Sequence, residues 1–395
     1  MRNSRRRNAR YKKLKHKKMS PYIFFLPTLF ILIIICFITS VVNKKNDLNF
    51  IEKDILHNKN TLIGTGAGTS KGNTLTEVLI SSVGDCTLGT DPKFSGETMP
   101  VVLNNNNMNF SYLFKNVRSY FENDDLTIAN LETTFTEHNE KQTKAFNFKA
   151  SPSYAKALTL ASIETVNISN NHIYDYMQKG FEDTKKTLEN EKISYFGEGT
   201  IYKTKIKNKK FAMLGYQGWE GNVNFDKLKS LISDLKSDDY TVIINFHWGI
   251  ERQYYPIEFQ KKLSRFCIDN GADLIIGHHP HVLQGIETYK GKFICYSLGN
   301  FCFGGNTNPS DKDTMIVQTL FKFENDDLID IGLKVIPCSI SSVNYKNDYC
   351  PTPLKGSENS RVLTKLNKIS PDSGFKISEQ FHFEKQIKTE ININE

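Results

Sequence analysis

The sequence predicts an α/β fold built around a largely buried sheet. From residue 77 onward, short runs of β-branched and other apolar residues alternate with helical segments, which is typical of α/β domains. Six of these runs end in residues that bind metals or carry protons, so the candidate chemistry lies at the strand ends. With 39% hydrophobic and 24% charged residues, the bulk of the chain is neither disordered nor a polytopic membrane protein.

The predicted elements follow in order along the chain. Strands are predicted at 77–83, 125–129, 164–169, 211–216, 241–246, 272–277 and 292–298. A helix is predicted over 151–162, with Ser151 as its N-cap and Pro152 at its first position, and another over 256–271. Two alternating runs around a polar turn predict an antiparallel hairpin over 315–337 that closes the sheet.

The N-terminal region predicts a single transmembrane helix. Residues 1–20 form a basic tail, and residues 21–42 then run without a charge. At about 1.5 Å per residue, this stretch matches a hydrocarbon core of roughly 30 Å. A cleaved signal peptide is the alternative, but its apolar region is about 7–15 residues long and ends at a small-residue site that is absent here. The positive-inside rule places the N-terminus in the cytoplasm and the main domain outside.

The remaining segments complete the predicted organisation. Residues 43–76 read as a flexible linker, 77–340 as the main domain and 341–395 as a polar C-terminal extension without a clear partner. Residues 1–42 hold ten of the 51 basic residues and no acidic one, so the rest of the chain is nearly balanced and predicts no nucleic-acid partner. The cysteines are predicted to be buried thiols, with at most one disulfide, between Cys338 and Cys350.

The polar residues at the strand ends form a series. They are Gly84-Asp85, Asn130-Leu131-Glu132, Asn170-Asn171-His172, His247-Trp248, His278-His279-Pro280-His281 and Gly299-Asn300. Carboxylate, amide and imidazole ligands suit Zn²⁺, Mn²⁺ or Fe, and two such ions can clamp the oxygens of a phosphoester displacement. The pattern GxSxG, typical of acyl transfer, is absent from the sequence.

Each motif also has a purely structural explanation. A Gly-Asp after a strand is usually a turn, and His247 could be a core histidine. The three histidines between 278 and 281 are harder to explain by packing, because they follow a buried strand directly. The ordered series therefore favours a metal site more strongly than any one motif does.

The motifs GDCTLG, NLETTFT, SNNHIYDYMQKGFEDT, HWGIE, GHHPHVLQGIE and YSLGNF resemble the successive motifs of the CapA (poly-γ-glutamate/capsule biosynthesis) family. The resemblance covers roughly residues 77–305. Because that family is similar in fold to calcineurin-like metallophosphatases, the resemblance implies a layered α/β sandwich of metallophosphatase type. It also implies one or two divalent ions, Mn, Zn or Fe.

The resemblance assigns roles to residues in the first three motifs. Asp85 matches the first-strand aspartate ligand, and Glu132 lies near the bridging carboxylate. Asn171 matches the amide ligand, and His172 matches the histidine that acts as general acid or transition-state stabiliser. Two departures are visible: Cys86-Thr87 follows Asp85 where metallophosphatases have Asp-x-His, and Asn130-Leu131-Glu132 replaces Gly-Asp. One metal site thus loses an imidazole.

The later motifs complete the predicted site. His247 matches the fourth-motif ligand, and His279 and His281 fit the H-x-H ligand pair, with a register starting at Gly277-His278 as the alternative. The residues predicted to bind substrate are Asn130, Glu251, His278 and Asn300.

Two functions follow from these observations. The first is a membrane-anchored, metal-binding CapA-like protein acting in capsule or poly-γ-glutamate synthesis or export. The alternative is an extracytoplasmic metal-dependent hydrolase of phosphoesters or polymer amide bonds, unrelated to capsule. The predicted partners are the lipid bilayer, membrane proteins of a polymer synthase or export complex, and an anionic polymer or phosphorylated substrate.

Overall fold

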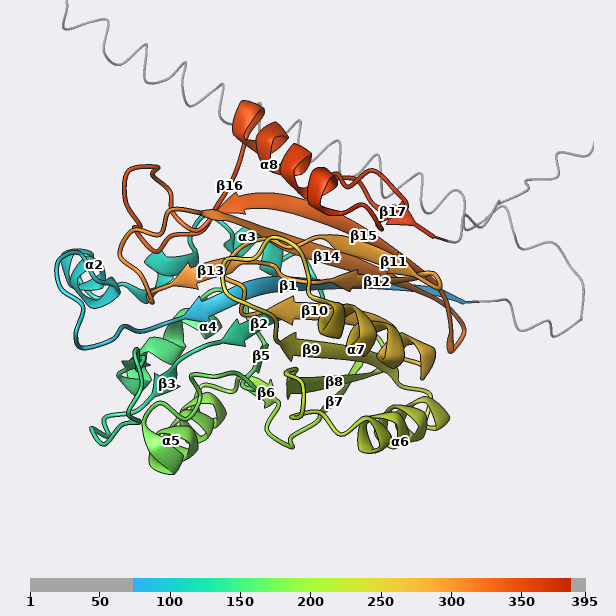
Figure 1. Ribbon diagram of the computed structural model, residues 1–395, viewed down its shortest axis with the longest axis horizontal. Coiled ribbons are helices and arrows are strands. Elements are labelled where there is room, and N and C mark those ends of the chain that lie inside the picture. The colour runs from blue at the N-terminus through green and yellow to red at the C-terminus, as the bar shows by residue number, and fades with distance from the viewer. Residues whose placement is uncertain (1–73, 385–395) are drawn as a thin grey trace, which may run out of the picture. The chain divides into compact units, whose positions relative to one another are not determined.

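Two mixed β-sheets form the centre of the described part of the chain, residues 74–384 of a computed structural model (Figure 1). The predicted tail and membrane span, and all of the predicted linker up to residue 73, lie outside the described residues, as do residues 385–395. Among the described residues, none of the helices has the length and apolar character needed to cross a bilayer.

Within residues 74–384, the larger sheet has nine strands in the order β16-β15-β14-β1-β2-β5-β6, with β13 beside β1 and β17 beside β15. They are β1 (Leu75–Thr87), β2 (Leu126–Leu131), β5 (Thr165–Asn167), β6 (Ser194–Phe196), β13 (Asn300–Phe303), β14 (Asp313–Glu324), β15 (Asp327–Ser339), β16 (Thr352–Pro353) and β17 (His382–Phe383). β1, β2, β5, β6 and β13 run parallel, and the hairpin predicted over 315–337 is β14 and β15.

The smaller sheet has the order β11-β12-β10-β9-β8-β7. Its strands are β7 (Tyr202–Ile206), β8 (Lys209–Gln217), β9 (Thr241–His247), β10 (Leu274–His278), β11 (Ile286–Tyr289) and β12 (Lys292–Cys295). The four central strands are parallel, and the two edge strands are antiparallel. β3 (Thr134–Phe135) and β4 (Lys149–Ala150) form a separate ribbon. Each of the seven predicted strand runs overlaps an observed strand.

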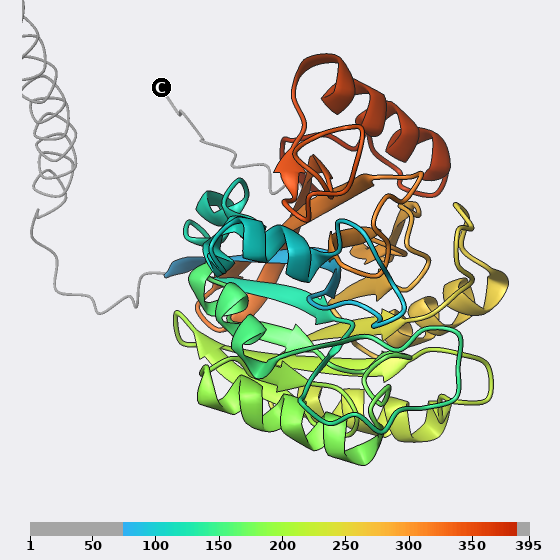
Figure 2. The ribbon, with the colours of Figure 1, turned by 90° about the vertical axis from the view of Figure 1, so that its left-hand side faces the viewer.

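The two sheets face each other across an apolar core. Ile80 and Ile128 of the larger sheet pack in one buried cluster with Met213, Ile243 and Ile276 of the smaller sheet. Because each sheet is buried on both faces, its central strands are apolar on both sides, which explains the continuous hydrophobic runs in the sequence. The predicted α/β class is therefore confirmed, with helices outside and two sheets inside (Figures 1 and 2).

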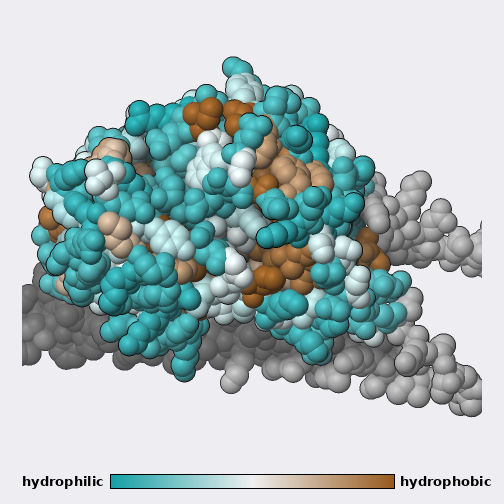
Figure 3. Space-filling model, turned by 60° about the horizontal axis from the view of Figure 1, so that its bottom comes forward, coloured by the Kyte–Doolittle hydropathy of each residue, from teal (hydrophilic) through white to brown (hydrophobic). Residues whose placement is uncertain are grey.

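Helices cover the outer face of each sheet. The larger sheet is covered by α2 (Met99–Asn105), α3 (Arg118–Phe121), α4 (Lys156–Leu160) and α5 (Met177–Asn190), and the smaller sheet by α6 (Phe225–Ser237) and α7 (Glu258–Asp269). The face that carries α5 and α6 is largely hydrophilic, with its hydrophobic residues in separate patches (Figure 3). Hydrophilic outer faces with apolar inner faces are what amphipathic covering helices require.

The two predicted helices are present with shorter bounds. The segment predicted over 151–162 begins as a 3₁₀ turn, Pro152–Ala155, and continues as α4. Ser151 occupies the N-cap position, but its side chain makes no capping hydrogen bond. The segment predicted over 256–271 is α7, at whose start Gln260 Oε1 accepts a hydrogen bond of 3.0 Å from the Ile257 N–H.

The segment 341–384, expected to be a polar extension without a partner, belongs structurally to the same body. Its helix α8 (Gly356–Ile369) buries Val362, Leu366 and Ile369 in the core between the sheets, and β16 and β17 pair with β15. Arg361 fixes the helix further, because its guanidinium lies 2.6 Å from an Asp313 carboxylate oxygen. The apolar spacing of four and three residues was hidden among polar neighbours.

The thiols of the described residues are all buried. Cys86, Cys267, Cys295, Cys302, Cys338 and Cys350 are free, so Cys338 and Cys350 do not form a disulfide. Burial raises the pKa of the Cys86 thiol to about 12, which keeps it protonated beside Asp85.

We expect Leu366→Ala to lower the free energy of unfolding by about 2–5 kcal/mol, because it removes a fully buried side chain and leaves a cavity. The exposed Lys368 of the same helix provides the control, and Lys368→Ala should change stability by less than about 0.5 kcal/mol. Denaturant unfolding of the purified chain measures both. Equal, small effects from the two substitutions would show that α8 is not part of the folded core.

Candidate metal centre

The predicted ligands meet where the two sheets present the carboxyl ends of their parallel strands. The arrowheads of β1, β2, β9, β10 and β13 point the same way in Figure 1, and Figure 2 looks onto that edge. Asp85 pairs in register with Asn130 of β2 and Asn300 of β13, and His247 of β9 pairs with His278 of β10. This edge is where ligands bind in open α/β sheets.

Asp85 is positioned by a close approach of β1 to the chain before β13. A Cβ on Gly84 would lie 2.0 Å from the Gly299 carbonyl oxygen, so only glycine fits at position 84. The Asp85 N–H donates a hydrogen bond of 3.0 Å to that same oxygen. At its carboxylate, Oδ1 accepts from Asn130 Nδ2 at 2.8 Å, and Oδ2 lies 3.2 Å from His281 Nδ1. The Gly-Asp motif is therefore more than a turn.

The other predicted ligands surround Glu132. Its Oε1 lies 3.4 Å from His247 Nε2 and 3.8 Å from His281 Nε2, and the ligand atoms of Glu132, His279 and His281 all lie within 4.8 Å of one another. His247 Nε2 lies 3.1 Å from His279 Nδ1 and 2.8 Å from Asn171 Oδ1. Together with Asp85, these side chains form one cluster, called here the metal centre: Asp85, Glu132, Asn171, His247, His279 and His281.

An unpartnered carboxylate oxygen shows that this centre fits a cation. Glu132 is fully buried, and although Thr87 Oγ1 donates to its Oε2 at 3.2 Å, its Oε1 has no hydrogen-bond partner among the described residues. Leaving such an atom buried and unpaired is costly. His279 and His281 also have φ of 95° and 57°, a left-handed conformation that is strained for side chains other than glycine. A bound ion would give Oε1 its missing partner and account for the strain.

Burial sets the charges of the imidazoles and carboxylates. It lowers the pKa of His247 to about 3 and lowers that of His279 too, so both rings are neutral. Burial and the Asp85 charge raise the pKa of Glu132 to about 7. Burial opposes the charge on His281, but Glu132 and Asp85 outweigh it and raise the pKa of His281 to about 10. The carboxylates thus already attract one positive charge.

His172 follows the metal-centre residue Asn171, and the buried Asp175 holds its ring. Its Nδ1 lies 2.8 Å from Oδ2 of the fully buried Asp175, which also forms an ion pair with Lys144. Lys144 Nζ donates to the Asn171 carbonyl at 2.7 Å, and the Phe148 ring lies 4.3 Å from the His172 ring between centroids. With Nδ1 engaged, Nε2 is the ring nitrogen available to another group.

The sequence analysis did not predict several of these contacts. Asp175 follows His172 by three residues in a turn, and a search for a carboxylate near the histidine could have found it. Lys144 and Phe148 come from the loop between β3 and β4, and no local pattern points to them. Trp219 packs against two of the metal-centre histidines. The centroid of its ring lies 5.2 Å from that of His279 and 5.9 Å from that of His247.

The four residues predicted to bind substrate differ in exposure. Asn130 and His278 are enclosed, and they contact Asp85 and Asn245 respectively. Asn300 Oδ1 lies 2.8 Å from His281 Nδ1, and Glu251 is exposed in the loop after β9. The first two hold neighbouring side chains in place, and substrate contact by any of the four stays a prediction.

Comparison with known proteins identifies the family. The family model "Bacterial capsule synthesis protein PGA_cap" matches residues 79–305. The "Capsule biosynthesis protein CapA" of Bacillus anthracis is 30% identical over 65% of this chain and 67% of that protein, and the "PGA biosynthesis protein CapA" of Bacillus subtilis (strain 168) is 28% identical over 67% and 72%. A "Probable polyglutamine synthesis accessory protein" of Mycobacterium tuberculosis (strain ATCC 25618 / H37Rv) is 23% identical over 56% and 68%.

One solved structure, that of TT1561 from Thermus thermophilus, aligns with a TM-score of 0.35 at 9% identity, over 61% of this chain and 94% of that one. A likeness this low says nothing about the site. The family match, by contrast, spans every motif that supplies the metal centre. The chain therefore belongs to the PGA_cap family of bacterial capsule synthesis proteins, as the six motifs predicted.

Proposed function

We propose that this protein acts in the synthesis or export of a bacterial capsule polymer of the poly-γ-glutamate type, and that its metal centre holds one or two divalent ions. The observation that carries the proposal is the cluster of six family-motif side chains around Glu132, whose buried Oε1 has no hydrogen-bond partner among the described residues. Imidazole and carboxylate ligands suit Mn²⁺, Zn²⁺ or Fe. The domain would then be a metallophosphatase-type sandwich, a proposal supported by two facing sheets with ligands at their strand ends.

A metal-dependent hydrolase is the second candidate for the chemistry of the centre. It is favoured by His172, whose contact with Asp175 fixes its ring beside the metal ligands. A bound ion would polarise the bond to be cleaved, in a phosphoester or in an amide of the polymer. Asp175 would hold the His172 ring in one tautomer, and the other ring nitrogen would deliver a proton to a leaving oxygen or nitrogen.

We further propose that residues 21–42 anchor the domain to the outer face of the cell membrane, where it meets the other membrane proteins of a polymer synthase or export complex. The support is the uncharged run behind ten basic residues, which lies outside the described part of the chain. Protease added to intact protoplasts should degrade the domain and leave the basic tail protected. A protected domain would contradict this orientation.

The proposed role predicts a strain phenotype. Deleting the gene should abolish or strongly reduce surface polymer, and expressing the wild-type chain should restore it, because the proposed role is in synthesis or export. Glu132→Gln should restore it poorly despite normal protein levels, since it removes a ligand charge from the centre. Immunoblots for the chain and quantification of surface polymer measure both. Unchanged polymer in the deletion strain would contradict the proposed role.

A further inference from the structure

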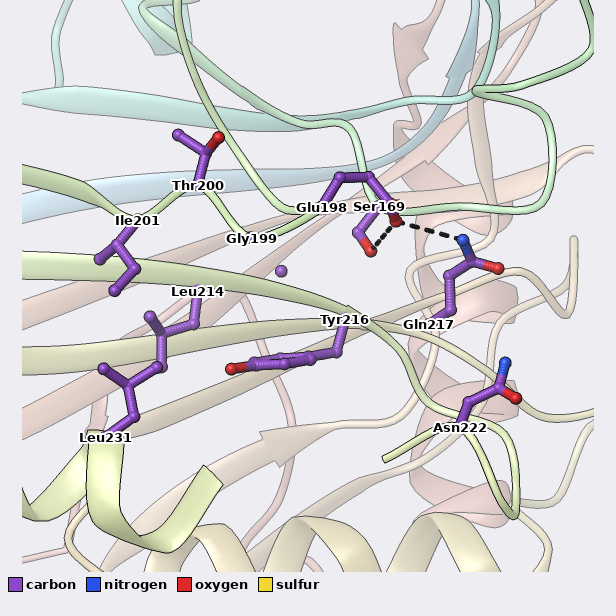
Figure 4. Close-up of a pocket in the computed structure, with 11 residues that line it drawn as sticks. Ser169, Glu198, Gly199, Thr200, Ile201, Leu214, Tyr216, Gln217, Asn222 and Leu231 are labelled. Carbon is purple, nitrogen blue, oxygen red and sulfur yellow. Dashed lines mark hydrogen bonds between the residues drawn. The ribbon is translucent and has the colours of Figure 1, made fainter. Parts of the chain in front are cut away.

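A pocket adjoins the metal centre and is not explained by the metal ligands. It measures about 490 Å³, within the usual size range of small-molecule sites, and lies between β8 and the turn that joins β6 to β7 (Figure 4). Ser169 of the pocket precedes Asn171 by two residues, and Gln217 pairs in register with His247 across β8 and β9. The segment after β5 therefore lines the pocket and supplies a metal ligand, and β8 lines the pocket beside the strand that carries His247.

The carboxylate of Glu198 is held at the rim of this pocket by neutral donors. Ser169 Oγ donates to Glu198 Oε1 at 2.7 Å and Gln217 Nε2 donates to the same oxygen at 3.2 Å (Figure 4). Tyr174 OH donates to Oε2 at 3.2 Å. Among residues 74–384, Glu198 forms no ion pair, and lysine, arginine and histidine are absent from the pocket lining. The carboxylate is thus fixed in place and can still accept a hydrogen bond from a ligand.

The backbone conformation at Glu198 is unusual for a glutamate. Glu198 and Gly199 have φ of 49° and 85°, and the amides and carbonyls of Gly197 and Thr200 bond to each other at 2.9 Å in both directions. This tight turn favours asparagine or glycine at its first central position, so a glutamate is strained there. The three donors that fix the side chain explain how the strain is tolerated, and strain of this kind gathers at functional sites.

The rest of the pocket is apolar on one side and carries amides on the other. Ile201, Leu214 and Leu231 line one side, and the Tyr216 ring turns its face toward the space below Glu198 (Figure 4). Gln217 and Asn222 line the opposite side. A ligand that fits has one apolar face, hydroxyl groups along its edge and no negative charge, because a carboxylate would be repelled by Glu198.

We propose that this pocket binds a neutral glycosyl unit, a ligand separate from the γ-linked glutamate chain of the proposed function. The apolar face of the sugar ring would pack on Tyr216, and its hydroxyls would donate to Glu198 and exchange hydrogen bonds with Gln217 and Asn222. An aliphatic amine would donate to Glu198 but make no hydrogen bond to the amide oxygens of Gln217 and Asn222 through its alkyl chain. The proposal goes beyond the proposed function, and sugar binding does not need the metal.

The test measures binding of methyl glycosides of glucose, galactose and N-acetylglucosamine to the full chain in detergent, by saturation-transfer NMR and titration, with and without divalent metal. We expect at least one of them to bind with an affinity independent of salt, since the ligand is neutral. Tyr216→Leu should weaken binding about three- to tenfold and Tyr216→Phe should not, because only the ring face is needed. Glu198→Gln should weaken it about tenfold or more.

The matched control is Glu258→Gln, an exposed change on α7 that should leave sugar binding unchanged. Metal content should be the same in all these variants, which separates a failure of this subsite from a failure of the metal centre. The proposal is overturned if none of the three glycosides binds, or if binding is insensitive to both Tyr216→Leu and Glu198→Gln. It is also overturned if butylamine binds in a salt-dependent way and the sugars do not.

Discussion

We expect His172→Ala to remove most of any hydrolytic turnover that the protein has and to leave its metal content unchanged. The ring is held by Asp175 at 2.8 Å beside the ligands, where a positioned imidazole can protonate a leaving group. General acid catalysis of this kind is typically worth about 10²–10⁴ in rate, so turnover should fall by that factor. The measurement is a hydrolase panel on the full chain, covering phosphoesters and γ-glutamyl amides, together with elemental analysis of the same samples.

The contrast with His247 makes this result specific. His247→Ala should lose metal, because its ring lies 3.4 Å from Glu132 and 3.1 Å from His279. The loop residue His138, which lies outside the metal centre, provides the control. His138→Ala should change neither turnover nor metal content. If His172→Ala and His247→Ala both lose metal, His172 is a ligand and the assignment is wrong. Full polymer synthesis in a His172→Ala strain would favour a non-catalytic role in capsule synthesis.

Glu132→Gln should sharply lower metal occupancy without unfolding the chain. The substitution removes one negative charge at nearly constant volume, and a cluster of mainly neutral imidazoles depends on carboxylate charge to hold a divalent ion. The metal-free variant should stay folded, because the Asp85 carboxylate, 3.2 Å from His281 Nδ1, still balances the charge of that ring. Titration with Mn²⁺ and Zn²⁺ and thermal unfolding without metal measure the two effects.

Glu287→Gln is the matched control, since it also changes a buried glutamate. Glu287 accepts from Arg265 and from the Tyr296 hydroxyl, each at 2.7 Å, so its charge is used in structure. We expect that variant to lose stability and keep its metal, the reverse of Glu132→Gln. Unchanged metal affinity in Glu132→Gln, with unchanged melting, would assign Glu132 to a structural hydrogen bond.

Much of the fold could be predicted because its strands are buried on both faces. Runs such as 241–246 are rich in apolar residues and buried at every position, and residues of that kind have few alternatives to a central strand. Helix α8 could not be predicted in the same way, since Val362 and Leu366 lie in a mostly polar segment and find their apolar partners only when the sheets come together. The pairing of β17 with β15 depends on the same long-range contact.

The residues of the site also fall into those that the sequence predicts and those that it does not. The ligands could be predicted because each lies at or shortly after the carboxyl end of a strand, and the carboxyl ends of parallel strands converge. Asp175 and Lys144 support His172 from segments that the sequence does not mark, and Glu198 reaches its donors only through the pairing of β6 and β8 with their neighbours. Residues that act through contacts between distant segments leave no local pattern.

Metal content of the full-length wild-type chain tests the central claim most directly. Elemental analysis after purification without chelators, and again after loading with Mn²⁺, Zn²⁺ or Fe²⁺ and desalting, should give about one or two ions per chain. The same analysis of His247→Ala should give a strongly reduced value. If the wild-type chain retains none of the three metals above the His247→Ala background, the cluster of Asp85, Glu132, His279 and His281 is not a metal centre.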